Sequence, residues 1–206
     1  MLIDAALSAV LNVLVLAALP LLGYFAYHKA RHKRGAREIL IRCGLTVGET
    51  RYIGYCAVFA LLVVSALVVW PPPLQELLRE GSAWRPFAGM GLGRKAVAMS
   101  LLYGVVKTGF AEEFLFRGLI AGSLSRRFAM RWANLMQALV FLVPHLLLLF
   151  IMPEMWLVLP AVFLGALFVG WARIRSGSIL GPWLAHACLN IAMGLSVAIR
   201  SATAMP

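Results

Sequence analysis

Six long apolar runs dominate this chain of 206 residues and constrain its fold more than any other feature. A helix needs about 20 mainly apolar residues to cross the hydrocarbon core of a bilayer. Hydrophobic residues make up 62% of the chain and charged residues only 13%, which lies outside the usual balance of a soluble globular domain. We therefore predict an all-α, polytopic membrane helix bundle of about six transmembrane helices, over approximately residues 2–27, 52–70, 96–120, 131–152, 155–172 and 178–200.

Basic residues are concentrated in alternate loops. Twelve Lys and Arg residues follow the first, third and fifth runs, whereas five lie in the segments expected on the opposite side. Cytoplasmic loops of membrane proteins carry such an excess, so we expect both termini outside and the basic loops in the cytoplasm. The basic loops can bind anionic lipid headgroups, which accounts for the net charge of +11. We therefore expect the lipid bilayer as a partner and do not expect nucleic acid.

The distribution of polar residues divides the chain into two regions. Residues 1–95 hold two apolar runs, a basic loop and an outer loop rich in Pro and Gly, and they contain no recognisable motif. Residues 96–206 hold four apolar runs and carry nearly all of the ionisable residues found inside a run. We predict an N-terminal two-helix membrane region, residues 1–95, followed by a four-helix membrane core, residues 96–206.

The stretch "AEEFLFRGL", residues 111 to 119, places charged groups inside the third run. A charge at mid-bilayer costs about 2.5–3.5 kcal/mol on insertion scales, so such groups should face inward and pair. Glu113 and Arg117 are four residues apart and share a helix face, which predicts an ion pair. Glu112 is turned about 100° away and has no local partner, so its carboxylate is the one available for chemistry.

Two later runs add further polar groups. His186 and Asn190 in "HACLN" are four residues apart and point the same way, as do Phe141 and His145 in "FLVPH". A carboxylate, two imidazoles and an amide could therefore converge from three helices. That set of groups is suited to acid–base hydrolysis.

Together these motifs resemble the CPBP family of intramembrane proteases, also called Abi or type II CAAX proteases. The family pattern is EExxxR, then FxxxH, then HxxxN or HxxxD on successive core helices. The chain matches it with Glu112, Glu113 and Arg117, with Phe141 and His145, and with His186 and Asn190.

The resemblance implies an intramembrane endopeptidase in which Glu112 activates water, assisted by His145. His186 and Asn190 would bind that water and stabilise the oxyanion, while Glu113 and Arg117 would support the site. The implied substrate is a membrane-anchored protein or peptide cleaved towards the cytoplasmic leaflet, and the implied location is a bacterial inner membrane. The resemblance assigns no residue to substrate binding, and prenylation of the substrate does not follow from it.

Several alternatives remain open at this stage. Glu112, His145 and His186 match the ligand set of some catalytic zinc sites, although no local ligand pair such as HExxH is present, and we favour a metal-free mechanism without a cofactor. A small proton-coupled transporter could use the same intramembrane charges, but we find no internal repeat. A membrane immunity or scaffold protein could act by binding alone.

Overall fold

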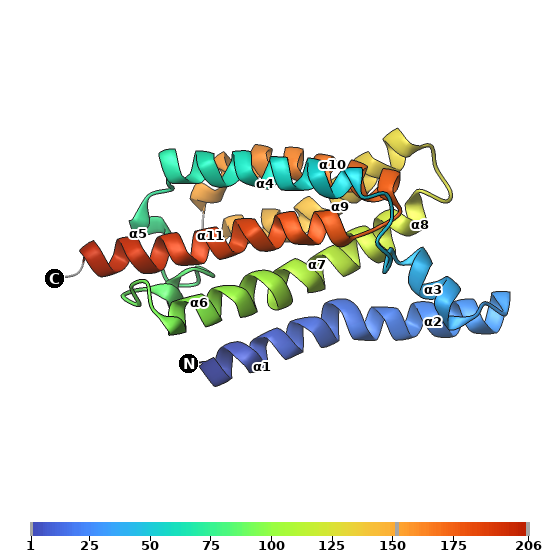
Figure 1. Ribbon diagram of the computed structural model, residues 1–206, viewed down its shortest axis with the longest axis horizontal. Helices are drawn as coiled ribbons and strands as arrows, with labels where there is room; N and C mark the ends of the chain where they lie inside the picture. The colour runs from blue at the N-terminus through green and yellow to red at the C-terminus, as the bar shows by residue number, and fades with distance from the viewer. Residues whose placement is uncertain (1, 151–152, 205–206) are drawn as a thin grey trace.

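Long helices run side by side along the molecule in the computed structural model, which describes residues 2–150 and 153–204 (Figure 1). No strand occurs in this described part. Apolar side chains cover much of the exterior, as expected for helices that contact lipid tails. The long helices are, in chain order, α1–η1–α2 (Leu2–Val13, Leu14–Ala18 and Leu19–His32), α4 (Arg51–Val69), α6 to α8 (Arg94–Leu101 to Gly122–Leu124), α9 (Met130–Leu147), α10 (Leu159–Ser176) and α11 (Leu180–Ala204).

Shorter elements connect these helices. Helix α3 (Ala36–Arg42) follows the first long helix, and α5 (Leu74–Leu77) and η2 (Arg85–Phe87) interrupt the loop rich in Pro and Gly. Two 3₁₀ segments, η5 (Leu148–Phe150) and η6 (Pro153–Leu157), lie between α9 and α10. Because its long helices are apolar and its described residues contain no strand, the protein is an integral membrane protein of the predicted all-α class.

The boundaries differ from the prediction in several places. The first helix continues to His32, because Lys29 and Arg31 can extend their charged ends towards water from a helical backbone. The fifth lies four residues later than predicted, over Leu159–Ser176 rather than 155–172. The predicted fourth span ended at 152, whereas α-helix ends at Leu147; residues 151–152 lie outside the described residues.

Within the described ranges, five helices are long and apolar enough to cross a membrane by length and composition. The predicted third span is not among these five, because it carries four charged residues, Lys107, Glu112, Glu113 and Arg117. It is nevertheless helical throughout. From Arg94 to Leu124, α-helical turns alternate with two π-helical stretches, η3 (Leu102–Phe110) and η4 (Phe114–Ala121).

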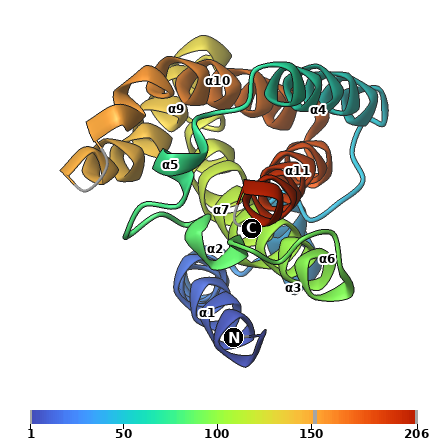
Figure 2. The same cartoon turned by 90° about the vertical axis from the view of Figure 1, so that its left-hand side faces the viewer.

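The charged third helix lies inside the bundle. Helix α11 packs against α4, α6 and η3, and α1 packs against η3 on the other side (Figure 2). Gly104 allows this close approach of η3 and α11, since a Cβ there would lie 2.9 Å from the carbonyl oxygen of Ala187. Charged groups on η3 to η4 are thus shielded from lipid by neighbouring helices.

Polar contacts hold the remaining helices around this centre. Gln137 of α9 is fully buried and donates to the carbonyl oxygen of Ala166 on α10, at 2.9 Å. Arg173 of α10 donates to the carbonyl oxygens of Arg117 and Arg42, at 3.0 and 3.1 Å. These bonds join α10 to α9, η4 and the end of α3.

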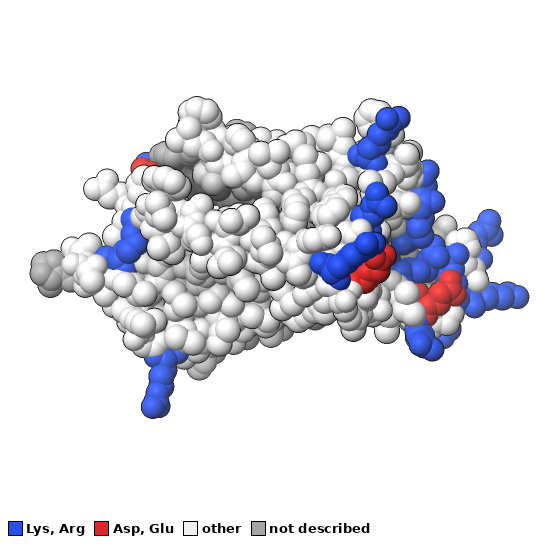
Figure 3. All heavy atoms as spheres, turned by 45° about the horizontal axis from the view of Figure 1, so that its top comes forward, with Lys and Arg blue, Asp and Glu red and all other residues white. Residues whose placement is uncertain are grey.

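The two ends of the molecule differ in charge. Both chain termini lie at one end (Figure 1), and Lys and Arg side chains gather at the opposite end (Figure 3). Termini on the same side agree with an even number of passes through the membrane. That the basic end faces the cytoplasm stays a prediction from the positive-inside rule, as does the division at residue 95.

Candidate active site

The two adjacent carboxylates lie on α7 (Ala111–Glu113), the short α-helical stretch between η3 and η4. Glu113 points into the bundle and only 1% of its side chain is exposed. Its Oε1 lies 3.0 Å from Nη1 of Arg117, which is equally buried. The spacing of four residues therefore produces the ion pair that the sequence indicates, and each charge offsets the cost of burying the other.

Phe141 of α9 supports this pair from the side. The guanidinium carbon of Arg117 lies 4.0 Å from the centre of the Phe141 ring, within the range of a cation–π interaction. Phe116 packs edge-on against the same ring, with centroids 5.0 Å apart. The aromatic residue of the FxxxH motif thus holds the arginine in place.

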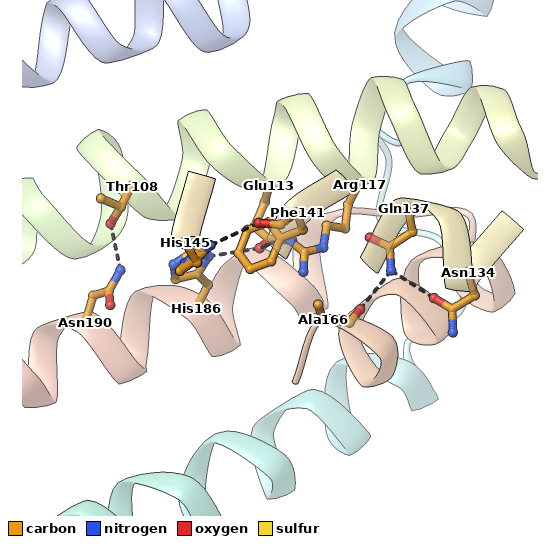
Figure 4. A network of polar contacts seen from close by, with 10 residues as sticks. All are labelled: Thr108, Glu113, Arg117, Asn134, Gln137, Phe141, His145, Ala166, His186 and Asn190. Carbon is orange, nitrogen blue, oxygen red and sulfur yellow. Dashed lines mark hydrogen bonds and ion pairs between the residues drawn. The ribbon is translucent and has the colours of Figure 1, made fainter. Parts of the chain in front are cut away.

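His186 of α11 is hydrogen-bonded to Glu113 across the bundle, with 2.9 Å between Nδ1 and Oε1 (Figure 4). A carboxylate can only accept, so Nδ1 must carry the proton of this bond. In the neutral ring, Nε2 is then an acceptor. Glu113 therefore orients the imidazole as well as pairing with Arg117, a role that the sequence did not indicate.

His145 of α9 is oriented in a similar way. Its Nδ1 lies 2.9 Å from the carbonyl oxygen of Phe141, and a carbonyl oxygen also can only accept. The ring of His145 is 4.8 Å from that of Phe141. Its Nε2 is left as an acceptor when the ring is neutral.

Glu112 differs from its neighbour in having no bonded partner. It is partly exposed, and none of the described residues forms a hydrogen bond or ion pair with it. It is nevertheless close enough to interact electrostatically with His186 and His145, as well as with Glu113 and Arg117. The structure thus groups Glu112 with both imidazoles and leaves its carboxylate available.

Asn190 is held by a residue that the sequence analysis did not single out. Its Nδ2 donates to Oγ1 of Thr108 at 2.7 Å, and that hydroxyl donates to the carbonyl oxygen of Tyr103 at 2.9 Å. Thr108 is buried on η3. A buried Thr one turn before the carboxylates was the available signal, but its partner lies 82 residues away on α11.

This contact leads to a first testable prediction. Thr108→Val keeps the shape of the side chain but removes the acceptor for Asn190, so the carboxamide is no longer fixed. We expect destabilisation of about 1 kcal/mol, typical of an interhelical polar contact in a membrane protein. Thermal unfolding in detergent would measure this, with Thr203→Val, at an exposed position, as the control. Equal stability of the two variants would contradict the assignment.

Zinc was the alternative for these residues. In the part of the chain that the structure describes, no three His, Cys, Asp or Glu side chains are grouped closely enough to bind a metal ion. Zinc stays an alternative for Glu112, His145 and His186, and we derive no step through a metal.

The comparison with protein families agrees with the motifs. Residues 93–192 match the family described as type II CAAX prenyl endopeptidase Rce1-like, and this match contains every site residue described above. The part of the chain that holds the motifs is thus similar to the CAAX protease-like family, which supports a protease of this general type. No curated protein and no solved structure matches the chain.

Proposed function

We propose that this protein is an intramembrane endopeptidase in which Glu112 activates a water molecule for attack on a peptide bond. The observation that carries the proposal is the contrast between the two adjacent carboxylates. Glu113 is buried in bonds to Arg117 and His186, whereas Glu112 has no such bond and lies near two oriented imidazoles. A general base needs a free carboxylate that can reach water.

The chemistry follows from the donors and acceptors at the site. The water donates one O–H to Glu112 and the other to an imidazole Nε2, and its oxygen attacks the scissile carbonyl. Glu112 takes the proton, and the carbonyl oxygen becomes the oxyanion of a tetrahedral intermediate. Glu112 then gives the proton to the departing nitrogen, the C–N bond breaks, and an amine and a carboxylic acid are released.

Asn190 is the group best suited to stabilise the oxyanion. One Nδ2 proton is used on Thr108, which orients the amide, and the second can be donated to the developing charge. The neutral imidazoles cannot do this, because their bonds to Glu113 and Phe141 occupy the only N–H of each ring. Of the two roles expected of His186, we keep the first, binding the water, and assign the oxyanion to Asn190.

The position of the site along the bundle favours a scissile bond near the basic end. Glu112 is 12 residues before Leu124 and 18 after Arg94, so it lies nearer to the basic end of this helix. If the basic end is cytoplasmic, substrate is cleaved in the cytoplasmic half of the membrane. The substrate class that fits is a membrane-anchored protein or peptide.

Proteolysis in proteoliposomes tests the proposal. A candidate membrane-anchored substrate, such as one encoded nearby, is incubated with the wild-type protein in ¹⁸O-labelled water, with and without a strong chelator. We expect cleavage that is unchanged by the chelator, with ¹⁸O in the new C-terminal carboxyl group. Activity that is lost with the chelator and restored by zinc would contradict the metal-free mechanism.

A further inference from the structure

A cavity of about 320 Å³ lies between α1, η3 and the loop around η2, outside the group of residues described above. It lies where α1 packs against the third helix. Most of its lining is apolar, including Phe87 and Met99, but two charged side chains also line it, Asp4 and Lys107.

The two charges lie at different depths. The amide of Asn12 donates to the carbonyl oxygen of Lys107 at 3.2 Å, which places these residues at the same level on the packed helices. Asp4 precedes Asn12 by eight residues, or about 12 Å along the helix towards the chain termini. Asp4 therefore belongs to the outer part of the cavity, and Lys107 to its inner part.

Lys107 has no carboxylate partner among the described residues. Its Nζ instead lies 5.3 Å from the centre of the Tyr103 ring. An ammonium group in the interior of a membrane protein is costly unless it is paired or lines a hydrated cavity, and it commonly marks a ligand or ion pathway. Nothing in the proposed hydrolysis uses this charge.

Tyr103 links the cavity to the candidate active site. Its side chain lines the cavity, and it is also close enough to Glu112 for the two groups to interact electrostatically. Along the helix, Lys107 lies five residues before Glu112, which corresponds to about 7.5 Å. An extended peptide covers about 3.3–3.6 Å per residue, so a few residues span this distance.

We propose that this cavity binds the part of the substrate next to the scissile bond, and that Lys107 selects a carboxylate in that part. The inference rests on the proposed function, because it makes the occupant a peptide. The carboxylate belongs either to the C-terminus of the substrate or to an acidic side chain. Lys107 is a specificity-determining residue and takes no part in the hydrolysis itself.

Short peptides bound to the protein in nanodiscs of zwitterionic lipid test this proposal. The probes are acetyl-trileucine with a free C-terminus, its C-terminal amide, and an amide in which one leucine is replaced by glutamate. All are measured on the Glu112→Gln variant, so that no probe is hydrolysed. A charge-assisted bond to Lys107 should make a carboxylate probe bind about 10- to 100-fold more tightly than the neutral amide.

Adding Lys107→Met should abolish this preference while leaving the affinity for the neutral amide unchanged. Lys107→Arg should retain the preference. Lys95→Met is the matched control, since Lys95 lies on the same helix but does not line the cavity, and it should retain the full preference. The glutamate probe then shows which of the two carboxylate positions is recognised.

Two results would overturn the inference. One is equal binding of all three probes to the protein with Lys107 intact; the other is a carboxylate preference that survives Lys107→Met. Both results are binding measurements, so neither requires the protein to cleave a peptide. If cleavage depended on Glu112 but not on these charges, the specificity assignment alone would fail. If binding followed the charges but no substrate were cleaved, the proposed hydrolysis would fail instead.

Discussion

Glu112→Gln is expected to lower the rate of peptide cleavage by about 10²- to 10⁴-fold, the contribution typical of a general base. Gln has nearly the same shape as Glu but cannot take a proton from water. Because Glu112 has no hydrogen bond or ion pair to another described residue, the substitution breaks no contact of this kind. We therefore expect the variant to fold normally. Initial rates of cleavage in proteoliposomes measure its activity, and thermal unfolding measures its stability.

The adjacent carboxylate provides a sharp comparison. Glu113→Gln makes the same chemical change one residue away, but it removes the charge that pairs with Arg117 and His186. We expect this variant to lose stability as well as activity. If Glu112→Gln kept more than about a tenth of the wild-type rate, the general base would have to be another group. Full retention of a biological role without turnover would favour a binding protein.

The helical framework could be predicted from the sequence because its cause is local. Apolar runs of about 20 residues indicate spans, and the spacing of four residues indicates that Glu113 and Arg117 share a face. Most helix ends differ by only a few residues. The third run was also predicted correctly to be helical, although its charged residues keep it out of the five helices that are apolar enough to cross a membrane.

Contacts between helices could not be predicted in this way. The bond from His186 to Glu113 joins residues 73 apart, and that from Asn190 to Thr108 joins residues 82 apart. Each partner depends on how two helices are rotated against each other. A motif indicates that a histidine and a carboxylate meet, but not which of two adjacent carboxylates accepts the bond.

The π-helical turns also could not be predicted from the sequence. A purely α-helical repeat of 100° per residue would place Lys107 about 140° around the axis from Glu112. Nine residues from Leu102 to Phe110 are π-helical, and their wider turns change which side chains share a face. No pattern of apolar residues showed this local change of period.

Arg117→Met is expected to destabilise the protein strongly, by about 3–5 kcal/mol. It removes the main counter-charge from Glu113, whose side chain is 1% exposed, and it also removes the cation–π contact to Phe141. Breaking a buried pair costs more than the pair contributes, because the remaining charge cannot be hydrated. The free energy of unfolding can be measured by titrating the purified protein with a denaturing detergent.

Arg51→Met is the matched control. Arg51 also forms an ion pair, with Glu49 at 2.7 Å, and also lies over an aromatic ring, that of Tyr52, but 64% of its side chain is exposed. Water can hydrate the charge left behind, so we expect a loss below about 1 kcal/mol. Similar losses for the two variants would contradict a role for burial at the inner pair.

A double variant separates the cost of an isolated charge from the value of the pair. Adding Glu113→Gln to Arg117→Met removes the unpaired carboxylate and leaves an amide that His186 can still contact. The double variant should therefore regain part of the stability that the single variant loses, although it should remain inactive. If the two losses simply added, Glu113 and Arg117 would not act as a pair. Recovery of stability without recovery of cleavage would show that the pair permits burial of the charges and that cleavage also needs the pair itself.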